Sequence, residues 1–381
     1  MPPPPIANVA PAPPPVSHAP FAIFGRLVDE EGRVVRTLPG IGEADVAEPV
    51  GSDRYRIRGQ ILDAATGALA PERVPAAIAT IDSQQEAYAL ERYRADGAPA
   101  WTVPLHGWRS LRPPELAVGG GRVVISFDHD VRAFDAQTGA PSWAANDDDG
   151  SRLEIGGDTA YYVKCNEPTH DHWLIGRALA DGAERFRAAL PAPCDPWIRV
   201  GDRHVIVINE GHSPTTTVFD LAGRELYRLS ELVGGSLEVP HGAGSDLLLV
   251  TDQHIERIGD DGAVRWRLGR PESTFVADDD FVALPTGEVV IANYGAIDDG
   301  GIDVMRIATD DGRIAWRTHV PGLGVGHSEY FQSVYARARG AALFVISQAA
   351  GGWYMERLSL ATGARERRCG AGTPACAAAR R

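Results

Sequence analysis

Long hydrophobic runs, lysine and cysteine are scarce in this sequence, and each scarcity excludes something. No stretch of 18 apolar residues occurs, so the sequence predicts no transmembrane helix. Lys164 is the only lysine among 37 basic residues, which we interpret as a habit of composition rather than a binding device. The net charge of −14 argues against nucleic acid and against an anionic membrane surface as partners.

Sequence patterns for common catalytic chemistry are also missing. No G-x-S-x-G nucleophile motif occurs, and no cysteine pair has the C-x-x-C redox spacing. His170 and His172 offer two imidazoles, but no third metal ligand is evident. The run NDDDG (146–150) resembles a calcium loop, yet Gly156 stands where the twelfth position needs glutamate. We therefore predict no metal site and no catalytic residue.

Four cysteines form two plausible local pairs, Cys165 with Cys194 and Cys369 with Cys376. An even count with short spacings fits disulfides in an oxidising compartment, although four thiols in a cytosolic protein fit the count as well. Cys369–Cys376 is the better candidate, because it would hold a Gly/Ala/Pro-rich tail. Residues 1–20 show no signal peptide. We expect an extracytoplasmic location, in the periplasm or cell envelope, with the cytoplasm as the alternative.

The chain repeats one short pattern, in which a glycine turn is followed four residues later by an aromatic side chain. The copies are RYRADGAPAW (92–101), AFDAQTGAPSW (133–143), ALADGAERF (178–186), FDLAGRELY (219–227), RIGDDGAVRW (257–266) and RIATDDGRIAW (306–316). A seventh, LSLATGARER (358–367), keeps the glycine and loses the aromatic. Glycine between two alternating runs predicts a tight hairpin. The even offset places the aromatic on a fixed face of the next strand, where it suits packing between neighbouring sheets.

A second pair of short runs precedes each hairpin, which gives four strands in roughly 40 residues and is typical of a propeller blade. The phrase "alternating run, Asp, x-x-Thr-Gly, two or three residues, Trp" resembles the repeat of the pyrroloquinoline-quinone-like (PQQ-like) β-propellers. The resemblance covers about 77–368. The Gly-His and Trp-Asp pairs of WD repeats are absent. A β-sandwich or β-solenoid with incidental Asp-Gly turns is the alternative.

We predict an all-β protein, a β-propeller of eight four-stranded antiparallel blades, with seven blades as the alternative. The units fall at about 77–114, 115–152, 153–197, 198–235, 236–274, 275–327 and 328–369. Residues 21–75 contain two more hairpins, which form a degenerate first blade, strands that close the ring, or a separate β-module. Nine prolines in residues 1–20 predict an extended leader, and 370–381 a flexible tail.

A propeller places the loops between strands 2 and 3, and between strand 4 and the next strand 1, on one face. Most of the histidines, His254 among them, fall in these loops. Since function usually lies on loops of a rigid scaffold, we predict that this face binds the ligand. The alternative is that these loops carry polar residues for solubility alone. The predicted binding residues are His106, Trp108, Arg109, His129, His170, His172, Trp197, His212, His327, Glu329, Tyr330 and Trp353.

Two classes of function are consistent with this sequence. The first is a non-catalytic scaffold that presents the loop face to a protein or glycan partner, as a monomer tethered through its leader. It resembles the PQQ-like propeller of the outer-membrane assembly lipoproteins more than the enzymes. The second is an enzyme, a hydrolase, lyase or quinoprotein oxidoreductase, with its site at the channel mouth. The quinoproteins that the resemblance implies are much longer and carry adjacent cysteines, which this chain lacks, so we expect no PQQ or other cofactor.

Overall fold

The computed structural model describes residues 19–41, 47–50, 53–57, 60–71, 76–82, 87–94, 98–105, 114–127, 130–146, 150–166, 171–191, 196–209, 214–241, 244–251, 253–269, 280–294, 301–322, 333–349 and 352–370. Every regular element in these ranges is a β-strand, so none of them offers a helix able to span a bilayer. The strands form nine antiparallel sheets. The predicted leader, except residues 19–20, and the tail after residue 370 lie outside the described residues.

Six successive sheets have four strands each, in chain order. The first two contain β11 (Glu115–Gly119), β12 (Arg122–Phe127), β13 (Asp130–Asp135) and β14 (Pro141–Asn146), then β15 (Gly150–Gly156), β16 (Thr159–Asn166), β17 (Asp171–Ala178) and β18 (Glu184–Leu190). The next two contain β19 (Trp197–Val200), β20 (His204–Asn209), β21 (Thr215–Asp220) and β22 (Glu225–Leu229), then β23 (Val233–His241), β24 (Gly244–Thr251), β25 (His254–Ile258) and β26 (Val264–Gly269). The last two contain β27 (Asp280–Ala283), β28 (Glu288–Tyr294), β29 (Ile302–Ala308) and β30 (Ile314–Val320), then β31 (Ser333–Arg339), β32 (Ala342–Ala349), β33 (Gly352–Ser359) and β34 (Arg365–Gly370).

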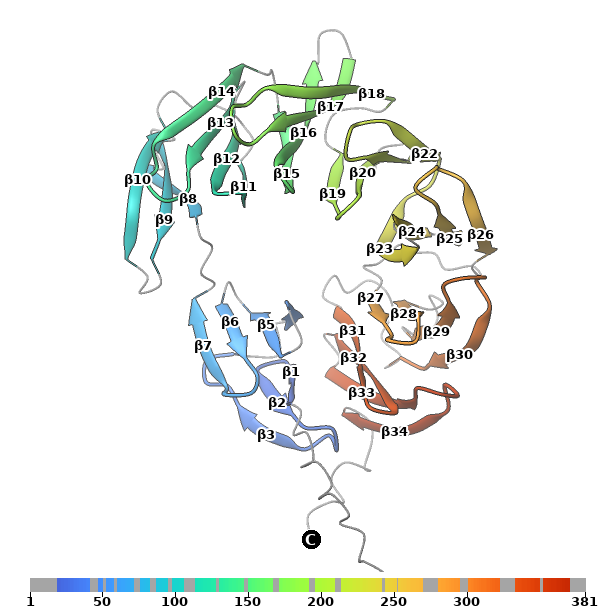
Figure 1. The fold of residues 1–381 in the computed structure, drawn as a ribbon. Helices are drawn as coiled ribbons and strands as arrows, with labels where there is room; N and C mark the ends of the chain where they lie inside the picture. The colour runs from blue at the N-terminus through green and yellow to red at the C-terminus, as the bar shows by residue number, and fades with distance from the viewer. Residues whose placement is uncertain are drawn as a thin grey trace, which may run out of the picture.

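Three smaller sheets precede these six in the chain. They are β1 (Phe21–Ile23), β2 (Arg26–Val28) and β3 (Val34–Thr37); β4 (Glu48–Pro49), β5 (Arg54–Ile57), β6 (Gln60–Asp63) and β7 (Ala68–Pro71); and β8 (Ala76–Asp82), β9 (Ala87–Tyr93) and β10 (Pro99–Leu105). Figure 1 shows the nine sheets arranged as a ring, with the first strand of each four-stranded sheet toward the centre and the last outside. The chain is therefore a β-propeller.

The second and third strands of each sheet form the core of the ring, because neighbouring sheets cover both of their faces. β20 is buried along all of its residues, whereas the outer strand β18 alternates between exposed and covered positions. One hydrophobic cluster joins Val124 and Val131 of one sheet to Tyr162 and Ile175 of the next. This two-sided burial explains why the middle strands read as continuous apolar runs.

The aromatic residue after each hairpin joins its sheet to the next one. The indole N–H of Trp143 donates to the Leu179 carbonyl at 3.0 Å, and a Cβ built on Gly182 would lie 2.6 Å from the indole ring. Gly182 has φ 74°, so glycine meets two needs at once, the left-handed turn and the close approach of the ring. Trp101, Phe186, Trp266 and Trp316 lie against the next hairpin glycine in the same way. The predicted packing is thus confirmed for five of the six aromatics.

Tyr227 is the exception among the six aromatics. The atom nearest to a Cβ on Gly262 is the Leu226 carbonyl oxygen, at 2.2 Å, and the Tyr227 hydroxyl instead faces Glu256 at 3.4 Å. An arginine takes the aromatic's place near the N-terminus. The guanidinium of Arg36 donates to the Thr66 carbonyl at 2.7 Å, directly over Gly67.

Residues 21–75 close the ring against the last sheet. The buried amide of Gln348 on β32 accepts from the backbone N–H groups of Phe24 at 3.1 Å and Ala47 at 3.3 Å. The Tyr335 hydroxyl donates to the Ala22 carbonyl at 2.8 Å, and the Arg339 guanidinium lies 3.9 Å from the Phe21 ring centroid. One hydrophobic cluster holds residues of the last sheet and of the two sheets formed by β1–β3 and β4–β7. Counting residues 21–75 as one unit gives the predicted eight blades, and that unit consists of two small sheets.

Candidate functional site

The loop face that the sequence predicted lies largely outside the described residues. The predicted binding residues outside them are His106, Trp108, Arg109, His129, His170, His212, His327, Glu329 and Tyr330. Of the remaining three, His172 and Trp353 are each only 9% exposed. His172 lies on β17 opposite Cys165 and Leu190, and Trp353 packs into the core that closes the ring. These two side chains therefore belong to the walls of the propeller rather than to an open surface.

Trp197 is the predicted residue that the structure places in solvent, with 46% of its surface exposed. It begins β19, directly after the link from the preceding outer strand, so it stands at the inner edge of the loop face. The guanidinium carbon of Arg152, on β15, lies 3.9 Å from the centroid of its ring. Arg152 also pairs with Glu115 of β11 at 3.4 Å. We call these three residues, from three successive inner strands, the inner-rim cluster.

A β-bulge aims Arg152 at the tryptophan. The β15–β16 register shifts between Ser151 and Leu153, and Arg152 adopts φ 52° in the left-handed region. A side chain other than glycine costs about 1–2 kcal/mol in that conformation. Such outliers are found at functional sites more often than elsewhere, and bulges commonly re-aim side chains there. The residue that takes the positive φ is an arginine rather than a glycine or asparagine, so sequence reasoning missed Arg152 and Glu115.

Glu154 follows on the same inner strand. Its side chain reaches solvent, but the surrounding wall excludes enough water to raise the pKa of the carboxyl, and the negative charge of Glu115 raises it further. The inner rim thus holds two acids, Glu115 and Glu154, and Glu115 is the one paired with Arg152. Arg199 of β19 extends the row by donating to the Gly234 carbonyl at 3.4 Å, which links it to β23.

A histidine–carboxylate pair also lies on the loop face. The Nδ1 atom of His254 lies 3.1 and 3.2 Å from the two carboxylate oxygens of Glu231. The Thr251 hydroxyl donates to the same carboxylate and accepts from the His254 backbone N–H at 2.9 Å. Glu231 lies between β22 and β23, so this pair joins two neighbouring sheets. It fixes the orientation of the imidazole, whose side chain stays 27% exposed.

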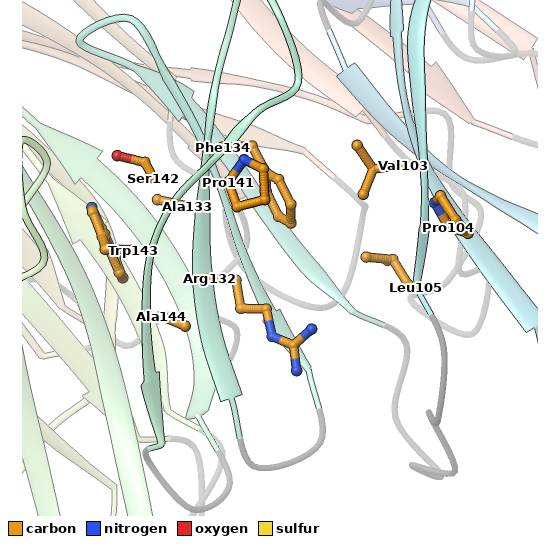
Figure 2. Close-up of a pocket in the computed structure, with 10 residues that line it drawn as sticks. All are labelled: Val103, Pro104, Leu105, Arg132, Ala133, Phe134, Pro141, Ser142, Trp143 and Ala144. Atoms are coloured by element: carbon orange, nitrogen blue, oxygen red, sulfur yellow. The ribbon is translucent and has the colours of Figure 1, made fainter.

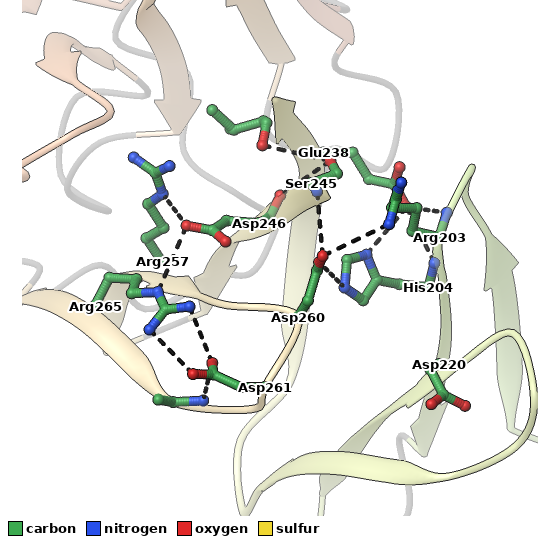
Figure 3. Close-up of polar contacts among 12 residues, drawn as sticks. Arg203, His204, Asp220, Glu238, Ser245, Asp246, Arg257, Asp260, Asp261 and Arg265 are labelled. Atoms are coloured by element: carbon green, nitrogen blue, oxygen red, sulfur yellow. Dashed lines mark hydrogen bonds and ion pairs between the residues drawn. The ribbon is translucent and has the colours of Figure 1, made fainter. Parts of the chain in front are cut away.

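The opposite face carries a second polar cluster, which the sequence did not indicate (Figure 3). His204 at the start of β20 is 3% exposed, and its Nδ1 lies 3.1 Å from the Glu238 carboxylate of β23. Its Nε2 faces Asp260 at 3.6 Å. The same Glu238 oxygen accepts the backbone N–H of Arg203 at 2.9 Å. Both carboxylates come from the next sheet, so the cluster fastens one sheet to another.

Arg257 makes a similar connection one sheet further along. It is 2% exposed, its Nε donates to Asp246 at 2.7 Å, and its Nη1 donates to the Thr309 carbonyl at 2.5 Å in the following sheet. A buried charge needs such a full set of partners. Both clusters join neighbouring sheets, so they contribute to the assembly of the ring.

The inner-rim cluster offers an exposed indole, a fixed guanidinium and one carboxylate. Within the described ranges, no group of three His, Cys, Asp or Glu side chains converges as metal ligands would. Aromatic and arginine side chains are the residues that most often dominate binding energy at protein interfaces.

The disulfide predictions have separate outcomes. Cys369 on β34 is disulfide-bonded, and its predicted partner Cys376 lies outside the described residues. Cys165 is a buried thiol on β16, so the structure does not support its predicted disulfide with Cys194, which also lies outside the described residues.

The ring of sheets and the aromatic contacts on hairpin glycines define a β-propeller that carries the repeat the sequence predicted. No family model and no curated protein matches the chain. Among solved structures, it is similar to one described as a eukaryotic initiation factor, at 10% identity and a TM-score of 0.56, over 93% of this chain and 96% of that one. BamB from Moraxella catarrhalis matches at 15% identity and a TM-score of 0.44, over 77% and 87% of the two chains. A europium-containing methanol dehydrogenase matches at 9% identity and 0.46, over 86% and 79%.

Proposed function

We propose that this protein is a non-catalytic propeller scaffold that binds a protein partner through its loop face. It acts as a monomer and without a resident cofactor. The observation that carries the proposal is the exposed Trp197, held under the Arg152 guanidinium at the inner edge of that face. Burying such an indole in a partner removes a large apolar surface from water.

Rigidity of the inner-rim cluster supports the same function. Arg152 is fixed by the bulge, by stacking and by Glu115, so little side-chain freedom is left to lose on binding. The propeller also places the cluster on three adjacent strands rather than on one loop. A partner segment that carries an apolar side chain and an acidic group fits this arrangement.

Quantitative affinity capture from an extract of the source cell tests the proposal. The wild-type protein is compared with Trp197→Ala and with Val264→Ala, an exposed residue at the start of the outer strand β26. Truncating an interface hot spot costs about 2 kcal/mol or more, or about 30-fold in affinity. A true partner is therefore lost with Trp197→Ala and retained with Val264→Ala.

Two outcomes would contradict the scaffold proposal in different ways. Equal recovery of every partner by all three proteins would exclude the inner rim as the binding surface. If the wild-type protein binds a glycan on an array and Trp197→Ala does not, the partner is a carbohydrate rather than a protein. Stoichiometric quinone, detected by absorbance of the purified protein, would overturn the absence of a cofactor.

A channel-mouth hydrolase or lyase is the second candidate function. The observation in its favour is His254, whose Nδ1 is held by Glu231 as in a catalytic base oriented by a carboxylate. If this candidate is right, His254→Ala abolishes an activity found in a substrate screen, whereas Trp197→Ala changes mainly KM. A screen without any His254-dependent turnover removes it.

An extracytoplasmic location is part of the proposal. The disulfide at Cys369 supports it, because disulfides persist mainly in oxidising compartments. Thiol alkylation of protein taken directly from the source cell, followed by mass spectrometry, tests it. Full alkylation of Cys369 without a reducing agent would favour the cytoplasm instead.

A further inference from the structure

A cavity of about 410 Å³ lies between two neighbouring sheets, at the outer side of the ring. Figure 2 shows Val103 and Leu105 of β10 on one side of it and Phe134 and Arg132 of β13 on the other. Ala144 of β14 lines the same cavity, which we call the β10–β14 slot. Its volume falls within the range of small-molecule sites.

One position of the repeat, at the outer edge of the seam, is alanine in this sheet and arginine in the five sheets that follow. Ala144 lies five residues after the hairpin glycine Gly139. The same offset in the five following sheets holds an arginine, namely Arg187, Arg228, Arg267, Arg317 and Arg368. The methyl group of alanine reaches far less than these guanidinium side chains do.

Two of these arginines show what the side chain does at its seam. Arg267 donates to the hydroxyl of Tyr227 at 2.5 Å, and Tyr227 belongs to the preceding sheet. Arg368 donates to the Pro321 carbonyl, which also follows the preceding sheet. Arg267 and Arg368 therefore span the outer part of the seam between two sheets, whereas Arg187, Arg228 and Arg317 pair with acids of their own sheets. Ala144 makes no such bridge, so its seam stays open as the slot.

The polar end of the slot is balanced in charge. Arg132 pairs with Asp130, two residues earlier on the same strand, at 2.5 Å. The side chains of Val103, Leu105 and Phe134 present hydrocarbon to the remaining space. An anionic ligand would have to displace or face the Asp130 carboxylate, whereas an uncharged apolar ligand would not.

We propose that the β10–β14 slot binds a small, uncharged, apolar molecule, with an aromatic or aliphatic body about the size of two fused rings. The hydrophobic effect supplies the binding energy, because the ligand covers apolar wall that water otherwise contacts. The site is independent of the loop face and its partner.

Fluorescence titration with the neutral probe N-phenyl-1-naphthylamine tests this proposal on the full chain. Saturable binding at one site per chain is expected. Ala144→Arg restores the residue of the other sheets and should weaken binding at least tenfold. The matched control is Ala315→Arg, which adds the same charge at an exposed position of the outer strand β30. It should leave binding unchanged.

Val103→Phe provides a second measurement, because it fills the slot from the opposite strand, and thermal melts establish that each variant is folded. Absence of saturable binding to the wild-type protein would overturn the proposal. If Ala144→Arg and Val103→Phe bind the probe as tightly as the wild type does, the probe binds elsewhere and the proposal is overturned too. Tighter binding of the anionic probe 8-anilinonaphthalene-1-sulfonate than of the neutral one would refute the uncharged ligand class.

Discussion

Removal of the Trp316 side chain should be among the most damaging single substitutions in this ring. The residue is 8% exposed and packs in the cluster that joins the last two four-stranded sheets. Large-to-small substitution of a buried tryptophan typically costs 3–5 kcal/mol, and we expect Trp316→Ala to destabilise the protein by about that amount. The exposed Trp197→Ala should change stability by less than about 0.5 kcal/mol.

Packing rather than hydrogen bonding should account for most of that cost. The indole N–H of Trp316 donates to the Leu360 carbonyl at 2.9 Å, but Arg306 donates to the same oxygen at 2.8 Å. Losing the indole therefore leaves the carbonyl satisfied. Trp316→Phe, which keeps a ring over the hairpin, should lose only about 1 kcal/mol.

The hairpin glycine beneath the ring gives a sharper test. Gly363 has φ 69°, and a Cβ placed on it would lie 2.5 Å from the Trp316 ring. Gly363→Ala should thus cost about 1–2 kcal/mol for the backbone, plus a steric penalty against the indole. In the Trp316→Ala background the steric part from the indole disappears and only the contact with Thr318 Oγ1, at 2.7 Å, stays, so the two substitutions should be non-additive.

Equilibrium urea unfolding, followed by circular dichroism, measures the four single variants and the Trp316→Ala/Gly363→Ala double variant, with hydrogen exchange of β30 and β34 as a local readout. Coupling between Trp316→Ala and Gly363→Ala is the decisive quantity. If Gly363→Ala lowers the free energy of unfolding equally in both backgrounds, the Trp316 indole does not pack on the glycine. The reasoning about the repeat then fails.

Three further predictions concern charge and ring closure. Arg185→Gln should raise the pKa of Asp158 from about 2 toward its ordinary value of 3.8, because hydrogen bonds from Arg185 hold it down; carboxyl NMR titration measures this. That pair favours the folded state above pH 3.8, and its contribution fades as pH falls toward 2. Gln348→Leu should cost about 1–3 kcal/mol by leaving buried N–H groups unpaired, measured by urea unfolding. Glu154→Gln should stabilise the protein at pH 7 more than at pH 4, since the folded carboxyl holds its proton more tightly than the unfolded one.

Each of these predictions has a contradicting result. An unchanged Asp158 titration would mean that Arg185 does not lower its pKa. A Gln348→Leu protein as stable as the wild type would remove the amide from the closure of the ring. A stability difference for Glu154→Gln that shrinks as pH rises would have the wrong sign for a raised pKa.

The sequence alone determined the fold class, because the repeat that specifies the fold depends on residues close together in the chain. A hairpin glycine followed by an aromatic at a fixed even offset recurs in six of the nine sheets, and both constraints act within about ten residues. The same local rule placed Trp197 at the start of an inner strand on the loop face. It could not separate Trp197 from His172 or Trp353, since exposure depends on what the neighbouring sheet covers.

Only the tertiary structure decided which residues meet between sheets. Arg152 reaches Trp197 through a bulge that no turn residue announces, and His204 finds both its carboxylates in the next sheet. Arg36 replaces a tryptophan over Gly67, a substitution that the aromatic pattern does not reveal. These contacts join residues about 30 to 56 positions apart, and strand alternation fixes the face of a side chain but not its partner. Partner identity follows from how the sheets pack around the ring, and that packing is a property of the whole chain.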